Sequence, residues 1–145
     1  MRRFTVWLIA ALFAAVTIPT ALAQSSASNS QVEALLGAYE GVAPDQWRAL
    51  GAAAAPILVS IATDHDALPT RRARSVDGLA ALGSGEATMR GLANSNREPL
   101  IVRMSAVRGL SQVLSQAALI DALRPLLQDA SSQVRGVAAE TLSSP

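Results

Sequence analysis

Apolar residues recur at helical spacing from residue 31 onward. Four of them fall on one face of a first helix: Val32, Leu35, Leu36 and Tyr39. Gly41 is expected to end this helix, and Pro44 suits the first turn of a second helix that carries Trp47 and stops at Gly51. Residues 31–51 are therefore predicted to form two helices that cap the rest of the chain.

The remainder of the chain repeats itself. Three segments share an Arg, a small residue and a Leu at the same spacing: Arg72, Ser75 and Leu79; Arg103, Ala106 and Leu110; Arg135, Ala138 and Leu142. The copies are offset by 31 and then 32 residues, and a shorter apolar segment precedes each one, at residues 57–62, 87–93 and 119–127. Such a period, with no convincing strand pattern, predicts an all-α chain of stacked antiparallel helical hairpins.

Small residues in the repeat indicate how the hairpins approach one another. One hairpin cannot bury its own apolar face, whereas stacked hairpins can. Six small residues are predicted at the helix contacts: Ala73, Ala106, Ala138, Gly78, Gly109 and Gly136. Leu79, Leu110 and Leu142 are expected to fill the space between layers, so truncating one of them should destabilise the domain.

The repeat unit resembles the HEAT repeat in its short bacterial form. The resemblance is carried by Asp66 six positions before Arg72, and by Asp129 six positions before Arg135. It implies a right-handed α-solenoid of about three repeats (52–82, 83–114 and 115–145) after the N-terminal helical cap. It also implies a ladder of hydrogen bonds between units, formed by Asp66, Arg72, Arg103, Asp129 and Arg135. In the middle unit Arg97 replaces the ladder acid and Glu98 lies one place off, so an interrupted ladder is expected.

The first 23 residues have the features of an export signal. A positive start, Met1-Arg2-Arg3, precedes an apolar run over residues 4–16, and Ala21-Leu22-Ala23 supplies small residues at a cleavage site. The run is shorter than the roughly 20 residues of a membrane-spanning helix, although an uncleaved anchor is the alternative. Residues 24–30 are polar and are expected to form a flexible tether. The predicted location is the periplasm or the exterior of a bacterial cell.

Charge and composition narrow the classes of partner. Without the signal, ten arginines face eleven carboxylates, so the net charge is −1 and gives no argument for nucleic acid or an anionic membrane. The chain has no cysteine, so an exported domain must be stabilised by packing without disulfides. The roughly 122 remaining residues suit one domain.

Three candidate chemical sites are weak. His65 lies between Asp64 and Asp66, but these neighbours cannot complete a tetrahedral metal site, so a polar turn is the favoured interpretation. The Gly83-Ser84-Gly85 stretch lacks the lysine of a phosphate loop and is interpreted as a link between repeats. Serine catalysis would need a base beside a nucleophile, and one loop histidine does not supply it. No catalytic residue, metal or cofactor is assigned.

The resemblance implies that the second helices of the hairpins line a concave face on which partners bind. The polar residues expected there are Arg74, Asp77, Ser105, Arg108, Gln112 and Glu140. Since the planar guanidinium of arginine engages carboxylates, an acidic partner is a hypothesis. The alternative is that the repeated arginines are structural and the other residues form a solvated face.

These observations predict an exported, non-catalytic protein-interaction scaffold. Two alternatives stay open: a tetrapyrrole-lyase-like or other small-molecule-associated HEAT protein, and a purely structural envelope protein. Few residues follow Leu142, so the last hairpin is expected to leave a partly apolar end that docks a partner or pairs with a second copy.

Overall fold

The computed structural model describes residues 29–144, and this part of the chain is all-helical, with no strand. The export signal expected at residues 1–23, and most of the expected tether, lie outside the described residues. Within the described residues, the N-terminal helix covers residues 29–36. It therefore includes the last two residues of the segment expected to be a tether.

Shorter and longer helices follow one another in the order that the repeat predicts. After α2 (Pro44–Ala49) and the 3₁₀ turn η1 (Ala52–Ala54), the elements are α3 (Ala55–Thr63), α4 (Pro69–Ala81), α5 (Glu86–Asn94), α6 (Leu100–Val113), α7 (Gln116–Leu123), the 3₁₀ helix η2 (Arg124–Gln128) and α8 (Ser132–Ser143). The apolar segment expected over residues 119–127 is thus divided at Arg124, next to Pro125. Proline cannot donate the backbone hydrogen bond that a continuous α-helix needs.

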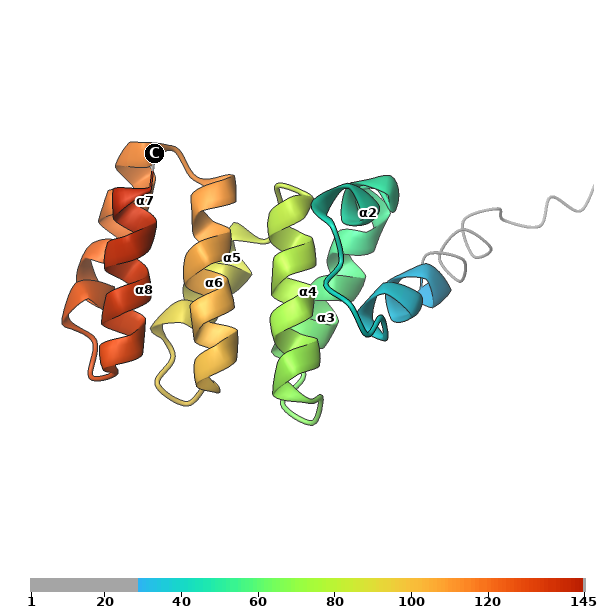
Figure 1. Ribbon diagram of the computed structural model, residues 1–145, viewed down its shortest axis with the longest axis horizontal. Coiled ribbons are helices and arrows are strands. Elements are labelled where there is room, and N and C mark those ends of the chain that lie inside the picture. The colour runs from blue at the N-terminus through green and yellow to red at the C-terminus, as the bar shows by residue number, and fades with distance from the viewer. Residues whose placement is uncertain (1–28, 145) are drawn as a thin grey trace, which may run out of the picture.

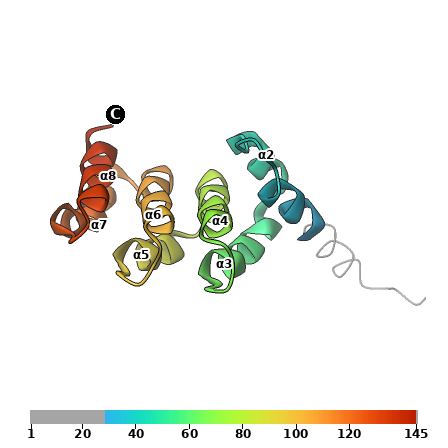
Figure 2. The ribbon, with the colours of Figure 1, turned by 60° about the horizontal axis from the view of Figure 1, so that its bottom comes forward.

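The helices pair into three hairpins that lie side by side. Figure 1 shows α4, α6 and α8 next to one another in chain order. Figure 2 shows α3, α5 and α7 in a second row, which lies below the first in that view. The most extensive packing joins α4 to α6, and α6 also packs on α8. We call α4, α6 and α8 the second helices, because each is the second member of its hairpin.

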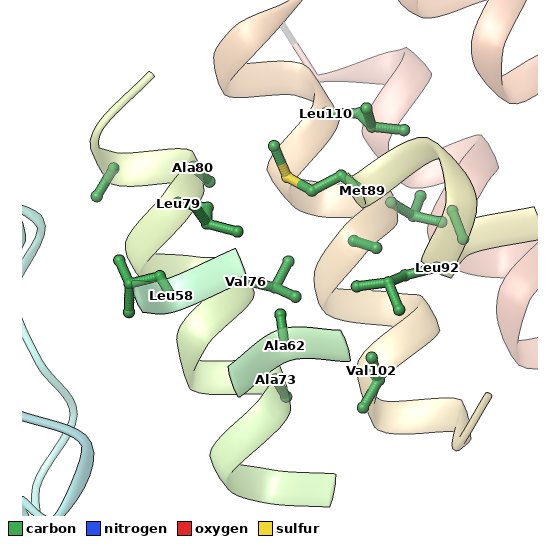
Figure 3. Close-up of a cluster of buried hydrophobic side chains, with 14 of the residues drawn as sticks. Leu58, Ala62, Ala73, Val76, Leu79, Ala80, Met89, Leu92, Val102 and Leu110 are labelled. Carbon is green, nitrogen blue, oxygen red and sulfur yellow. The ribbon is translucent and has the colours of Figure 1, made fainter. Parts of the chain in front are cut away.

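Side chains from neighbouring hairpins share one hydrophobic core. In Figure 3, Val76 of α4 and Leu92 of α5 point into the space between the first two hairpins, where Met89 also lies. These side chains are fully or almost fully buried, as is Leu110 of α6. Each hairpin therefore completes the burial of the next, and burying one such side chain contributes about 1.5–3 kcal/mol.

Glycines permit the closest contacts between helices. Of the three glycines predicted at such contacts, Gly78 and Gly109 are found there and Gly136 is not. A Cβ added to Gly109 would lie 2.5 Å from Met89 Sδ and 3.3 Å from the Cβ of Ala80 on α4. A Cβ at Gly78 would lie 3.0 Å from the Trp47 ring. The prediction is wrong for Gly136, because, outside its own helix, none of the described residues has an atom within 4 Å of that position.

The N-terminal helix ends earlier than expected. Val32 and Leu36 are buried, but the helix stops before Gly37, so Tyr39 lies outside it and is fully exposed (101%). The prediction that Tyr39 continues the apolar face is therefore wrong. Trp47 of α2 is buried against α4, as its place in an apolar cap suggests.

The glycine-rich segment between α4 and α5 is a helix end. Gly83 has φ +64°, and the Ser84 N–H donates to the carbonyl of Leu79 (3.0 Å), which together close α4 in the manner of a Schellman motif. Gly85 has φ +79°, and a Cβ there would lie 3.0 Å from a Leu79 methyl group. The structure therefore agrees with a link between repeats.

Candidate protein-interaction surface

Two arginines of the repeat are buried and join consecutive hairpins. Arg72 is only 2% exposed. Its Nε donates to the carbonyl of Ala62 (2.9 Å), at the end of α3, and its Nη2 donates to Glu98 Oε2 (2.5 Å), in the loop before α6. Arg72 thus satisfies the end of its own first helix and fastens the following hairpin.

Arg103 repeats this arrangement one hairpin later. Its Nε donates to the carbonyl of Ala93 (3.0 Å), and its two terminal nitrogens donate to the two carboxylate oxygens of Asp129 (3.2 and 2.5 Å). This bidentate pair lowers the pKa of Asp129, with a further contribution from the Ser131 N–H that donates to the same carboxylate. Both arginines reach a carboxylate 26 residues ahead.

The ladder is continuous through the middle hairpin, so the expectation of an interruption was wrong. Glu98 supplies the acid although it lies one position later than the repeat suggests, because its longer side chain reaches Arg72. Arg97, at the expected position, is exposed.

The prediction that Asp66 takes part in the ladder is also wrong. Asp66 is exposed, and among the described residues its carboxylate receives no hydrogen bond; its backbone N–H donates to Asp64 Oδ1 (2.9 Å). The position 26 residues before Asp66 is occupied by Glu40, which cannot be the cation of a ladder. The ladder therefore begins at Arg72.

Arg135 is the last arginine in the repeat register and has no following hairpin within this sequence. Its Nη1 donates to the carbonyls of Asp129 (2.8 Å) and Ala130 (3.1 Å) in the loop before its own helix. Unlike Arg72 and Arg103, it is exposed. Arg135 therefore closes its own loop, and no ladder bond of the expected kind extends from it.

The remaining arginines of α4 attach the N-terminal helix. Arg71 Nη2 donates to both carboxylate oxygens of Glu33 (2.5 and 2.6 Å). Arg74 Nη1 donates to the carbonyls of Leu36 (2.9 Å) and Ala38 (2.5 Å). These two carbonyls lie at the end of the N-terminal helix, where unsatisfied acceptors and the helix dipole both favour a cation.

Arg108 differs from every other arginine on the second helices. Arg71, Arg72, Arg74, Arg103 and Arg135 all donate side-chain hydrogen bonds. The guanidinium of Arg108 donates none within residues 29–144, and the side chain lies on the exposed face of α6. Of the arginines in the predicted site, Arg108 is the one that the fold does not use.

Arg108 belongs to a row of alternating charge. The positions that match it in the repeat, 31 residues earlier and 32 residues later, are Asp77 on α4 and Glu140 on α8. All three residues are exposed, and none forms an ion pair in the described part of the chain. We call Asp77, Arg108 and Glu140 the charge row.

The neighbours of Asp77 show that the row is a crowded polar surface. Although Asp77 is exposed overall, the surrounding helices partly remove its carboxyl from water, and this desolvation raises its pKa. A hydrogen bond with Ser105 and the charges of Arg108 and Arg74 act in the opposite direction. Arg74, Asp77 and Arg108 of the predicted site therefore come together between α4 and α6. Ser105 is buried beneath them, so the prediction that it is presented to a partner is wrong.

The other half of the row borders a pocket. A pocket of about 170 Å³ between α6 and α8 is lined by Arg108, Ser111, Glu140, Thr141 and Ser144. The Ser111 and Ser144 hydroxyls donate to the carbonyls of Arg108 (2.7 Å) and Glu140 (3.0 Å), which leaves their oxygens available as acceptors. The pocket thus offers a cation, an anion and hydroxyl groups. Gln112 is exposed on α6 but does not line it.

Repeat register alone did not identify the hydroxyl residues of this pocket. Ser111, Thr141 and Ser144 have no distinctive spacing as a group, and they line one pocket because α6 and α8 pack side by side. The available signal was the position of Ser111 three residues after Arg108 and of Ser144 four residues after Glu140, which places each about one turn from a charged residue.

The turn that contains His65 is polar. His65 Nδ1 lies 3.8 Å from Glu98 Oε1, so His65 neighbours the acid of the ladder, and its own side chain is largely exposed. Within residues 29–144, no group of three or more His, Cys, Asp or Glu side chains has an arrangement suited to a metal ion.

Comparisons with known proteins give no family for this chain: no protein-family model, no curated protein and no solved structure matches it. Within residues 29–144, none of the helices has both the length and the apolar character needed to cross a membrane.

Proposed function

We propose that this chain is an exported, non-catalytic protein-interaction module, built as a right-handed HEAT-like solenoid whose second helices bind a partner. The solenoid proposal is supported by the recurring bonds from Arg72 and Arg103 to an acid 26 residues ahead. A ladder of this kind is what the resemblance to HEAT repeats implies. The export proposal rests on the pattern of residues 1–23.

One observation carries the binding role. The second helices hold six arginines, of which five are bound to carbonyls or carboxylates of the fold, while Arg108 is exposed between two carboxylates of the charge row. Arginine is enriched at protein interfaces because its planar fork makes several directed hydrogen bonds. The hypothesis of an acidic partner is retained for the contact that Arg108 makes.

The test compares two arginine reversals of equal charge. The chain without residues 1–23 is immobilised and used to capture protein from an envelope extract, as wild type, Arg108→Glu and Arg97→Glu. Arg97 is an exposed loop residue away from the charge row, so it controls for net charge. We expect a stoichiometric partner to be retained by wild type and Arg97→Glu and lost by Arg108→Glu.

Other outcomes distinguish the alternatives. A coloured or small-molecule ligand in place of a protein would support the small-molecule-associated alternative and contradict the proposal. Capture of no component would favour a purely structural envelope role. Equal capture by wild type and Arg108→Glu would show that the partner binds elsewhere.

A further inference from the structure

The spacing and sign of the charge row define the chemistry of a complementary ligand. The row presents a carboxylate, a guanidinium and a carboxylate from three adjacent second helices. Opposite charges of the partner would therefore occur in the order basic, acidic, basic. A partner with its charges in another order would place at least one charge opposite a like charge of the row, which disfavours binding.

The distance between helices sets the spacing of those groups. Packed helices lie about 8–10 Å apart. In a polyproline II segment, residues three apart lie on the same face and are separated by about 9 Å, because each residue advances about 3.1 Å. The spacing of charged side chains that occur once in every three residues of such a segment therefore matches the spacing of the charge row, which has one charged side chain on each of α4, α6 and α8.

The surface favours an extended segment over a docked helix. A helix that binds in a groove uses a row of apolar anchors, whereas the row and its pocket consist of charged residues and hydroxyl groups. Of the large apolar side chains that are most exposed in the described part, only Ile101 lies on a second helix, two turns before Arg108 on α6, and a single apolar side chain does not make a row of anchors. The others lie outside the second helices: Tyr39, Leu68, Ile120 and Leu127. An extended segment keeps its backbone solvated and contacts this surface through polar side chains.

We propose that the charge row binds an extended peptide segment in which one acidic residue lies between two basic residues, each three positions away. The acidic side chain pairs with Arg108, and the basic ones pair with Asp77 and Glu140. The pocket beside Arg108 and Glu140 receives the polar groups of the peptide that lie between its acidic residue and the basic residue paired with Glu140. This inference rests on the proposed function and assigns the partner's chemical class.

The test uses three peptides that place the same kinds of charge differently. The first has the order Lys-x-x-Glu-x-x-Lys, with x drawn from Pro, Ser and Ala. The second keeps this composition but separates the charges by one residue, and the third has the reversed order Glu-x-x-Lys-x-x-Glu. Binding to the chain without residues 1–23 is measured by titration in an NMR spectrometer at low and high salt.

We expect the first peptide to bind about tenfold more tightly than the other two at low salt, because three exposed ion pairs each contribute a small, additive share. Its titration should shift the resonances of residues 77, 108 and 140 together. The triple variant Asp77→Lys, Arg108→Glu, Glu140→Lys inverts the row at exposed positions and should prefer the third peptide.

Equal binding of all three peptides, or no binding, would overturn the inference. Tighter binding of a helical peptide that repeats the charges every seven residues would overturn the extended conformation. If these peptides fail while Arg108→Glu still abolishes capture of a protein partner, the proposed function stands and only the assigned peptide chemistry is wrong.

Discussion

At the scale of single residues, the arginines divide by burial. Arg72 and Arg103 are buried and have carboxylate partners, and Arg74 holds the end of a helix. Arg108 is exposed and has no such bond in the described part of the chain. The same residue type therefore stabilises the fold at some positions and remains available for a partner at another.

The assignment of Glu98 to the ladder can be tested by removing its charge. Glu98→Gln leaves the buried guanidinium of Arg72 without a counter-ion, and we expect the free energy of unfolding to fall by about 3 kcal/mol. Arg97→Gln, one residue away and exposed, should change it by less than about 0.5 kcal/mol. Urea unfolding followed by circular dichroism measures both, and equal effects would contradict the assignment.

Asp129 predicts a dependence of stability on pH. The pKa of Asp129 in the folded state is below the ordinary value of 3.8. The ionised carboxylate therefore contributes its full share to the free energy of unfolding above pH 3.8, and this share is lost as the pH falls through the folded-state pKa. In Asp129→Asn this group no longer titrates. We expect the wild type to lose more stability than Asp129→Asn between pH 5 and about pH 2, as thermal melts would show. Parallel losses in the two proteins would contradict the ladder bond from Arg103.

The pairing in the ladder was recoverable from the sequence, but only with the correct spacing. The six-residue interval between Asp66 and Arg72 suggested that both residues belong to a ladder between units, but it did not say which acid each arginine binds. The observed bonds run from Arg72 and Arg103 to an acid 26 residues ahead. The 26-residue interval also excludes Asp66 from the ladder, because the residue 26 positions before it is Glu40, which is not a cation. The availability of Arg108 could not be predicted, because it depends on which carbonyls and carboxylates each arginine reaches in three dimensions.

At the scale of elements, hydrophobic periodicity predicted the helices of all three hairpins. It failed where backbone chemistry determines the end of a helix, at Gly37 and around Pro125. It also did not distinguish an internal helix from the last one. Gly109 and Gly136 both look like contact residues in the sequence, yet Gly109 faces α4 and Met89 while Gly136 faces open space.

These two glycines should therefore respond in opposite ways to the same substitution. Gly109→Ala forces Met89 or α4 to shift, and we expect a loss of about 1–3 kcal/mol from overpacking. Gly136→Ala adds a methyl group in open space, where the gain in helix propensity should stabilise by about 0.5–1 kcal/mol. Denaturant titrations measure both values. A loss of similar size at Gly136 would indicate that something packs on the outer side of α8.

At the scale of the whole molecule, two rows of helices give the protein two different sides. The second helices carry the charge row, and the first helices α3, α5 and α7 form the other row (Figure 2). The all-helical class followed from composition and period. The pocket between α6 and α8 did not, because it exists only where two hairpins meet. Self-association through the last hairpin stays a prediction.

The central claim is that a partner binds on the side formed by the second helices, and site-specific photo-crosslinking in cells that produce the full-length chain tests it most directly. A photoreactive residue is placed at Gln112, beside Arg108 on α6, or at Ser60, exposed on α3. The account predicts a discrete protein adduct from position 112, lost when Arg108→Glu is added, and none from position 60. An adduct from position 60 alone, or none from either position, would contradict it.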